Sequence, residues 1–241
     1  MKGKFGHWVR DYAHALRGLG RSFLYRKPPR HYLGYVREDK SPVILIPGLY
    51  SRWPFLKFLA DPLSRAGHPV YVLPRLGYHA SEIPRAAEIV RELIDAHHLE
   101  KVIILAHSKG GLVGKYVLAF LNRDRRVKKL IAIASPFGGS HAVRFFPLKP
   151  LRELYPSSPV VNMLREQSGA NHHITSIFGL FDNHVWPQES CRLEGAKNIQ
   201  VDVHGHHKIL FDHKVRDIVL REVELTDPNQ KRNKNYYDRR V

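Results

Sequence analysis

The chain has 241 residues, 43% of them hydrophobic, which is enough for a single domain with a sizeable core. No uncharged apolar stretch approaches the roughly 18 residues of a membrane-spanning helix, and the N-terminus lacks the continuous apolar middle of a secretion signal, so we expect a cytoplasmic protein. The net charge of +17 predicts attraction to anionic surfaces, and the single cysteine, Cys191, excludes an internal disulfide and a zinc cluster of the cysteine type.

Residues 1–40 form a basic segment with an amphipathic pattern. They carry ten Lys or Arg residues against three acidic ones, and Arg10, Arg17 and Arg21 lie opposite an apolar stripe when plotted at about 100° per residue. We expect a helix that packs this stripe onto the domain; the alternative is that residues 1–30 lie on an anionic membrane surface. The stripe consists of Phe5, Trp8, Val9, Tyr12, Leu16, Leu19 and Phe23.

Residues 41–226 alternate short apolar runs with helical patterns, which indicates an α/β fold. Near-continuous apolarity is typical of strands covered on both faces, so the sheet is expected to be mostly parallel, with helices on both faces. The predicted helices lie near 54–65, 84–98, 110–123 and 212–223. The predicted strands are 42–47, 69–74, 101–106, 129–134, 174–181 and 198–203.

Two segments depart from this alternation. Residues 143–170 are rich in proline and large apolar side chains, and they form either a short cap over a pocket or an ordinary helix pair at the sheet edge. Residues 227–241 are polar and basic, so we expect a frayed C-terminal tail.

The heptapeptide "LAHSKGG" (105–111) follows a strand and opens a helix, which is the setting of a nucleophile elbow. Its serine, Ser108, would occupy a strained turn that typically costs about 1 to 3 kcal/mol and requires small residues such as Ala106 and Gly110 two positions away. A capping serine is the plain alternative, and His107 is expected to point into the core. The partners of Ser108 decide between these interpretations.

An acid and a histidine should follow, each just beyond a later strand. Asp182 ends the fifth predicted strand, and "HGHH" (204–207) follows the sixth. His206 is the favoured base because of its Gly-His context, and His207 is the second choice. A metal site formed by these histidines with Asp202 or Asp212 is the alternative, but their spacing is weak evidence and we predict no metal.

The oxyanion of a tetrahedral intermediate needs backbone donors. The N–H groups of Lys109, directly after the serine, and of Leu49, in the loop "PGLY" after the first strand, are expected to supply them. Substrate contacts are expected from Tyr50 in that loop and from Phe145, Phe146 and Leu148 in the cap.

These motifs resemble the α/β-hydrolase superfamily, in particular its lipase and carboxylesterase branch, over roughly 41–225. "IPGLYS" is similar to the oxyanion loop, "AHSKGG" to the elbow of small bacterial lipases that begin it with alanine, and "FDNHVWPQES" and "GHHKIL" to the acid and histidine turns; "ASPFGGS" (134–140) matches a further segment. The resemblance implies ester hydrolysis through an acyl-enzyme without metal or organic cofactor, and the short cap favours an esterase or a lipase with an exposed site.

Two alternatives follow from the same residues. The same triad could transfer an acyl group to an acceptor or cleave a thioester or polyester. The fold could instead be a non-catalytic scaffold whose basic termini bind membrane or nucleic acid, although nucleic acid is not expected because the chain lacks an aromatic-plus-basic cluster.

Overall fold

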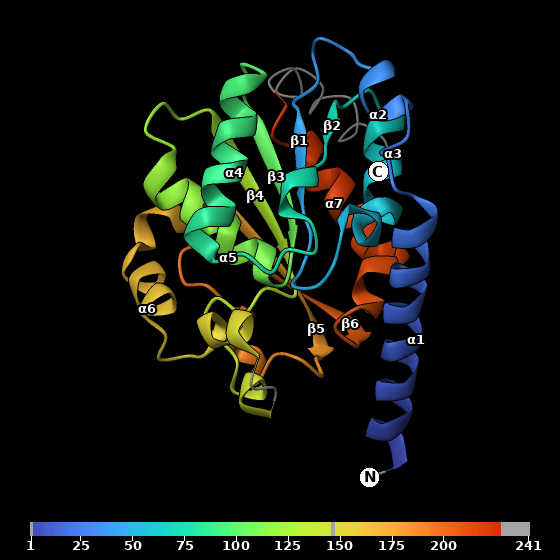
Figure 1. Ribbon diagram of the computed structural model, residues 1–241, viewed down its shortest axis with the longest axis vertical. Coiled ribbons are helices and arrows are strands. Elements are labelled where there is room, and N and C mark those ends of the chain that lie inside the picture. Colours follow the sequence, from blue (N-terminus) through green and yellow to red (C-terminus); the bar gives the residue numbers. More distant parts are fainter. Residues whose placement is uncertain (1, 146–147, 228–241) are drawn as a thin grey trace, which may run out of the picture.

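The computed structural model of the chain (Figure 1) describes residues 2–145 and 148–227, so Phe146 and the predicted tail beyond Asp227 lie outside the described residues. All six predicted strands are present and form one sheet in the order β2-β1-β3-β4-β5-β6. Every neighbouring pair is parallel, as expected for buried strands. The strands are β1 Val43–Ile46, β2 Val70–Tyr71, β3 Val102–His107, β4 Val127–Ile133, β5 Ile174–Phe181 and β6 Lys197–His204.

Helices cover both faces of the sheet (Figure 1), and alternate strand residues supply the two cores. Ile44, Ile104 and Leu130 pack in the core with α4 (Ile83–Ala96), α5 (Lys109–Tyr116) and α6 (Pro159–Glu166). Residues one position earlier or later, such as Leu45 and Ile103, pack in the core with α3 (Lys57–Arg65) and α7 (His213–Glu224). The mostly parallel sheet with helices on both faces that the sequence predicts is thereby confirmed.

The strand order places a switch point between β1 and β3. The chain leaves β1 toward α3 on one face and leaves the neighbouring β3 toward α5 on the other face. Loops that diverge in this way leave a crevice at the carboxyl ends of parallel strands, where ligands bind in open α/β sheets. Ser108 and the loop after β1 both lie at this crevice.

The segment between β4 and β5 divides into two parts. Its first part forms short helical turns, His141–Phe145 and Lys149–Leu154, that border a cavity; its second part, α6, packs against the core on the α5 side. Only the first part of 143–170 therefore borders the cavity, and the second part is a single α-helix on one face of the sheet rather than a helix pair at the sheet edge. At the start of the predicted tail, Asp227 is buried and its carboxylate lies 3.0 Å from the Lys40 ammonium.

The N-terminal segment is one helix, α1 (Lys2–Leu24), followed by the short α2 (His31–Gly34). The expectation that its apolar stripe packs onto the domain is wrong for Leu16 and Phe23, which are 69% and 71% exposed. The helix packs instead through Asp11, Gly18 and Ser22. Gly18 is required because a Cβ there would lie 2.3 Å from the ring of Phe55. The side chains of Phe5 and Val9 lie outside what the structure describes.

Candidate active site

Ser108 occupies a strained turn between β3 and α5. Its φ and ψ are 52° and −123°, in a region that L-residues rarely adopt, and its N–H donates to the Ile133 carbonyl at 2.9 Å. Gly110 is required by close approach, because a Cβ there would lie 2.4 Å from the carbonyl oxygen of Ile46. The collision is therefore with the end of β1 rather than across the turn itself. This geometry is that of a nucleophile elbow.

Asp182 and His206 meet at the same end of the sheet. The His206 Nδ1–H donates to the Asp182 Oδ2 at 2.8 Å, and both side chains are about 5% exposed. The other carboxylate oxygen accepts the backbone N–H groups of His184 and Val185 at 2.7 and 3.0 Å. Because Nδ1 is used in this way, Nε2 is the nitrogen of His206 that can accept a proton.

Burial and mutual attraction act against each other in this pair. Burial alone would disfavour both charges, but the proximity of His206, with the hydrogen bonds that Asp182 accepts, holds the pKa of Asp182 below its ordinary value. Likewise, burial is outweighed by the Asp182 charge and hydrogen bond, which raise the pKa of His206. The site therefore favours an ionised Asp182 beside a histidine that is easily protonated.

The loop after β1 lies directly against the elbow. A Cβ at Gly48 would be 3.2 Å from the Ser108 Cβ and 2.9 Å from the His107 ring. The backbone N–H groups of Leu49 and Lys109 donate to no other group within the described residues. The two N–H groups that the sequence predicts as oxyanion donors therefore have no acceptor within the described residues, and both belong to segments next to the Ser108 side chain.

Buried histidines support two loops: the loop after β1 and the loop after β6 that carries His206, which we call the histidine loop. The His79 Nδ1–H donates to the Pro47 carbonyl at 2.7 Å, and burial together with the Lys109 charge lowers the pKa of His79 to about 4. The His107 Nε2–H donates to the His206 carbonyl at 3.0 Å, and burial lowers the pKa of His107 well below its ordinary value. As expected, the His107 side chain is buried. Both rings are neutral supports near pH 7.

The backbone of the histidine loop is held by two further side chains that sequence reasoning missed. The side-chain Oδ1 of Asn183 accepts the backbone N–H of His206 at 3.1 Å. Asp11 of α1, which is fully buried, accepts the N–H groups of His207 and Lys208 at 2.6 and 2.9 Å, and the His207 Nδ1–H at 3.1 Å. No local motif marks Asp11, because its partners lie almost 200 positions away in the chain.

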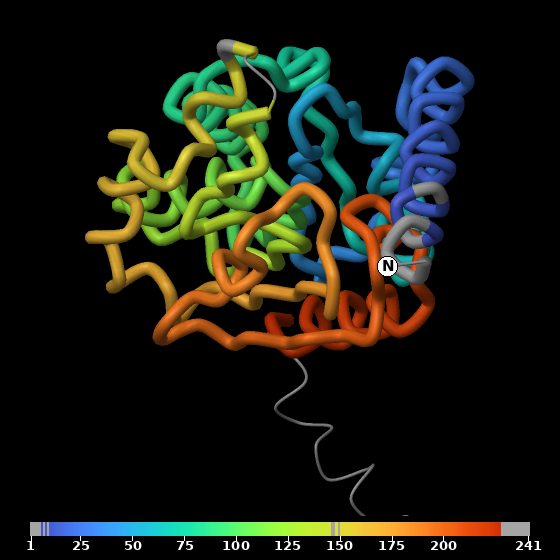
Figure 2. The backbone as a smooth tube through the Cα atoms, turned by 90° about the horizontal axis from the view of Figure 1, so that it is seen from below, coloured from blue at the N-terminus to red at the C-terminus, as the bar shows by residue number. Residues whose placement is uncertain are grey.

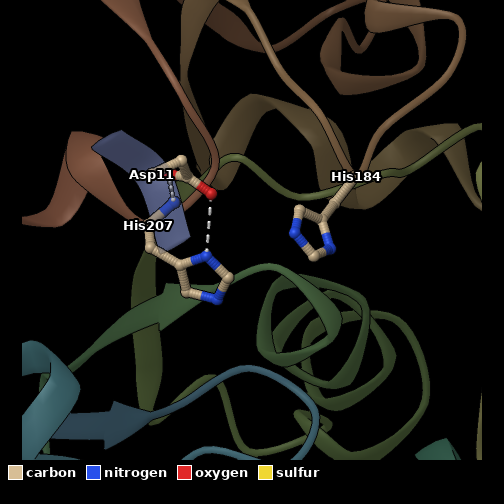
Figure 3. Close-up of side chains that lie close together, drawn as sticks. All are labelled: Asp11, His184 and His207. Atoms are coloured by element: carbon tan, nitrogen blue, oxygen red, sulfur yellow. Dashed lines mark hydrogen bonds and ion pairs between the residues drawn. The ribbon is translucent and has the colours of Figure 1, made fainter. Parts of the chain in front are cut away.

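Asp11, His184 and His207 form the group best placed to hold a metal ion among the described residues, with ligand atoms within 4.8 Å of one another. Figure 3 shows the His184 ring across from the hydrogen-bonded Asp11–His207 pair. Asp11 already accepts three N–H groups, so a metal would have to displace the His207 ring proton. Loop support accounts for this cluster without an ion.

The metal-site alternative from the sequence does not assemble as written. Asp212 caps α7 by accepting the Lys214 and Val215 N–H groups, and Asp202 lies 3.9 Å from His204. His207, the second choice as base, pairs with Asp11 rather than with Asp182. The histidines of "HGHH" therefore have different partners, and His206 is the one that is hydrogen-bonded to Asp182.

A cavity of about 350 Å³ lies over Ser108 and His206. This volume is in the range of small-molecule sites. Of the residues expected to contact substrate, Tyr50 and Leu148 line the cavity, whereas Phe145 is exposed with its ring 6.0 Å from that of Trp186. Helix α1 supplies a wall that the sequence did not predict: Trp8, Tyr12, Ala15 and Leu19. The remaining apolar wall comes from Phe55, Pro136, Ala142, Val143, Leu151, Leu154 and Val185.

Seen from the carboxyl ends of the strands, α1 runs along one side of the molecule, and the turns His141–Phe145 and Lys149–Leu154 lie across from it (Figure 2). An ion pair fixes the second side. Lys109, buried directly after Ser108, places its ammonium 3.0 Å from Glu153 and donates to the Ser81 carbonyl at 2.6 Å. The elbow and the cap segment are thereby linked.

Comparison with known proteins agrees with this architecture. A sequence model of the α/β hydrolase fold family matches residues 41–154, and no curated protein matches the chain in sequence. The fold is similar to that of Aspergillus fumigatus lipase B, with TM-score 0.64 and 19% identity over 81% of this chain; the chain spans only 58% of that lipase's length. Two shorter lipases match this chain over nearly their whole length.

The mature form of a Bacillus licheniformis lipase gives TM-score 0.59 and 14% identity over 79% of this chain and 95% of its own. A monoacylglycerol lipase of Paleococcus ferrophilus gives TM-score 0.54 and 14% identity over 78% of this chain and 95% of its own. The chain therefore has the α/β-hydrolase fold that its sequence predicts, and it shares that fold with these lipases. Residues 1–40, which carry Asp11, lie outside the family match.

Proposed function

We propose that this protein hydrolyses carboxylic esters with apolar acyl groups, using Ser108 as nucleophile, His206 as base and Asp182 to orient the histidine. The observation that carries the proposal is the buried 2.8 Å pair of Asp182 and His206 at a cavity that Ser108 also lines. A serine hydroxyl needs a base held by a third group, and this pair is such a base. The lipase-like fold supports the same reading.

In the first half of the reaction, the Ser108 oxygen bonds to the ester carbonyl carbon while His206 Nε2 takes the hydroxyl proton. Asp182 stabilises the imidazolium that forms. The negative oxygen of the tetrahedral intermediate accepts from the Leu49 and Lys109 N–H groups, each typically worth about 10² to 10³ in rate. Collapse expels the alcohol, which takes the proton back from His206, and leaves an acyl-Ser108 ester.

In the second half, a water molecule attacks the acyl carbon and gives a proton to His206. Collapse of the second intermediate releases the carboxylic acid, and the proton returns to the Ser108 oxygen. An alcohol in place of water would give acyl transfer by the same steps. Product analysis with and without an added alcohol distinguishes hydrolysis from transfer, and thioester and polyester substrates extend the panel.

Labelling with a fluorophosphonate tests the nucleophile directly. The wild type should be labelled and should hydrolyse p-nitrophenyl esters, and Ser108→Ala should lose the label and about 10⁴-fold or more of kcat/KM. Ser51 lines the same cavity, so Ser51→Ala is the matched control and should keep both. Undiminished labelling of Ser108→Ala would refute the assignment, and a wild type that neither labels nor hydrolyses any ester would indicate a non-catalytic scaffold.

A further inference from the structure

The outer face of α1 exposes a continuous apolar strip. Leu16 and Phe23 are 69% and 71% exposed, and Tyr12 and Leu19, which lie on the same side of the helix, are also exposed. Isolated exposed apolar residues are ordinary, but four on one helical face form a contiguous patch of the kind that marks an interaction site. We call these four residues the α1 outer face.

Exposure of large apolar side chains is concentrated at this end of the chain. Nine of the fifteen exposed large hydrophobic residues among the described residues fall between positions 12 and 36. Beyond the α1 outer face these are Leu24, Tyr25, Leu33, Tyr35 and Val36. Exposed large apolar side chains are therefore more frequent between positions 12 and 36 than in the rest of the described chain.

The charge of the same segment has one sign. Residues 2–37 contain nine Lys or Arg residues and a single acid, Asp11, which is fully buried against the histidine loop. The surface of this segment therefore presents apolar and basic groups without an exposed carboxylate. Arg10, Arg17, Arg26, Lys27 and Arg30 are all exposed.

We propose that residues 2–36 dock this protein on anionic lipid bilayers, with the α1 outer face in the acyl boundary and the flanking arginines and lysines on the lipid headgroups. Apolar side chains on one face and cations without acids around it are the features of helices that lie in the membrane interface. Phosphate contacts of a nucleic acid would use the cations but give no role to exposed Leu16 and Phe23. No helix among residues 2–145 and 148–227 has the length and apolarity to cross a bilayer, so the contact is with the surface.

The docked orientation brings the cavity to the lipid. Tyr12 and Leu19 belong to the α1 outer face and also line the cavity over Ser108. Tyr50 and Leu148, on other walls of the cavity, are exposed as well. If the proposed esterase function holds, an ester in the bilayer reaches Ser108 without first crossing water, so the substrate class is a membrane lipid ester.

Vesicle flotation tests docking independently of catalysis. Ser108→Ala protein is floated at low and high salt with two kinds of vesicle. One kind is phosphatidylcholine alone, and the other contains phosphatidylglycerol as well, at roughly a third of the lipid. Docking predicts binding that requires the anionic lipid and weakens with salt, and at least about a ten-fold weaker affinity when Leu16→Asp and Phe23→Asp are combined. The matched control is Leu225→Asp, because Leu225 is 57% exposed but lies outside residues 2–36; it should bind as the parent does.

A second measurement separates docking from the esterase proposal. In the wild-type background, Leu16→Asp with Phe23→Asp should keep its rate on a short water-soluble ester and lose about ten-fold on the same ester class presented in anionic vesicles. Absent flotation, or flotation that the double variant leaves unchanged, overturns docking even if the esterase is active. Salt-sensitive binding to RNA or DNA without vesicle binding would assign the segment to nucleic acid and overturn it as well. Melting curves confirm that the variants are folded.

Discussion

Asp11→Ala tests whether α1 supports the candidate catalytic loop. The substitution removes the acceptor of three N–H groups, those of the His207 and Lys208 backbone and the His207 ring. A buried donor left without a partner costs about 1 to 3 kcal/mol, and water entering beside the half-buried His207 reduces the total, so we expect a loss of about 3 kcal/mol. For a chain of this size that corresponds to roughly 6–12 °C in Tm.

Asp11→Asn separates support from charge. Its amide oxygen can still accept both backbone N–H groups, so the expected loss of stability is only about 1 kcal/mol. Asp11 also acts on the pKa of His206. Burial lowers this pKa, but the charge and hydrogen bond of Asp182 raise it, and the Asp11 carboxylate raises it further. Both variants should therefore shift the acidic limb of kcat/KM to lower pH, because His206 loses its proton more easily.

The assay combines thermal unfolding with pH profiles of ester hydrolysis. Asp217, which is exposed on α7, provides the matched control; Asp217→Ala should change neither Tm nor the profile measurably. A Tm of Asp11→Ala within about 1 °C of the wild type would refute the buried support. An unchanged acidic limb in Asp11→Asn would refute the electrostatic link to His206.

The sign of the pH dependence of Asp11 is also fixed. Burial opposes its ionisation, but the hydrogen bond and charge of His207 outweigh burial and hold its pKa far below the ordinary 3.8. A carboxyl with a depressed pKa stabilises the fold above its unfolded pKa and loses that contribution as the pH falls through its folded pKa. The stability difference between wild type and Asp11→Ala should therefore be full at neutral pH and shrink only in acid.

Two further predictions concern the elbow and the acid. Asp182→Asn should lower kcat about 10⁴-fold and, because the charge that raises the pKa of His206 is removed, should move any residual acidic limb to lower pH; an unshifted limb in a pH profile would contradict this. Gly110→Ala places a Cβ 2.4 Å from the Ile46 carbonyl oxygen and should cost about 1 to 3 kcal/mol or more in chemical denaturation. Gly169→Ala is the control, because nothing lies within 4 Å of its added Cβ. Equal denaturation midpoints for the two variants would contradict the prediction, because they would mean that β1 moves away from the Cβ at position 110 without cost.

Local patterns were sufficient for the fold because each strand and helix is specified by its own residues. The runs "VILI" and "VIILA" are apolar at every position because both faces of their strands are covered, and this property is visible without any tertiary contact. The elbow is also marked locally, by a serine followed by glycines at 110 and 111, although the contacts that require these glycines are with Ile46 and Ser135. The order of strands then brings Ser108, Asp182 and His206 to one edge of the sheet.

The packing of α1 depended on partners that only the folded chain provides. Its apolar stripe predicted the wrong buried face, since hydrophobic periodicity does not register a buried carboxylate or a glycine chosen for close approach. Gly205, at φ +130°, lets the loop come so near that an added Cβ would lie 2.6 Å from Asp11 Oδ1. A chain read one segment at a time contains no sign of that contact.

The sequence by itself therefore determined the strands, the elbow and the identity of the acid and base candidates, because backbone conformation and burial of alternating side chains act over a few residues. The tertiary structure alone decided that His206 rather than His207 pairs with Asp182, and that Asp11 takes His207. It also decided that α1 forms a wall of the cavity and leaves Leu16 and Phe23 in solvent. These outcomes rest on hydrogen bonds and close contacts between distant segments, whose geometry exists only once the sheet has brought those segments together.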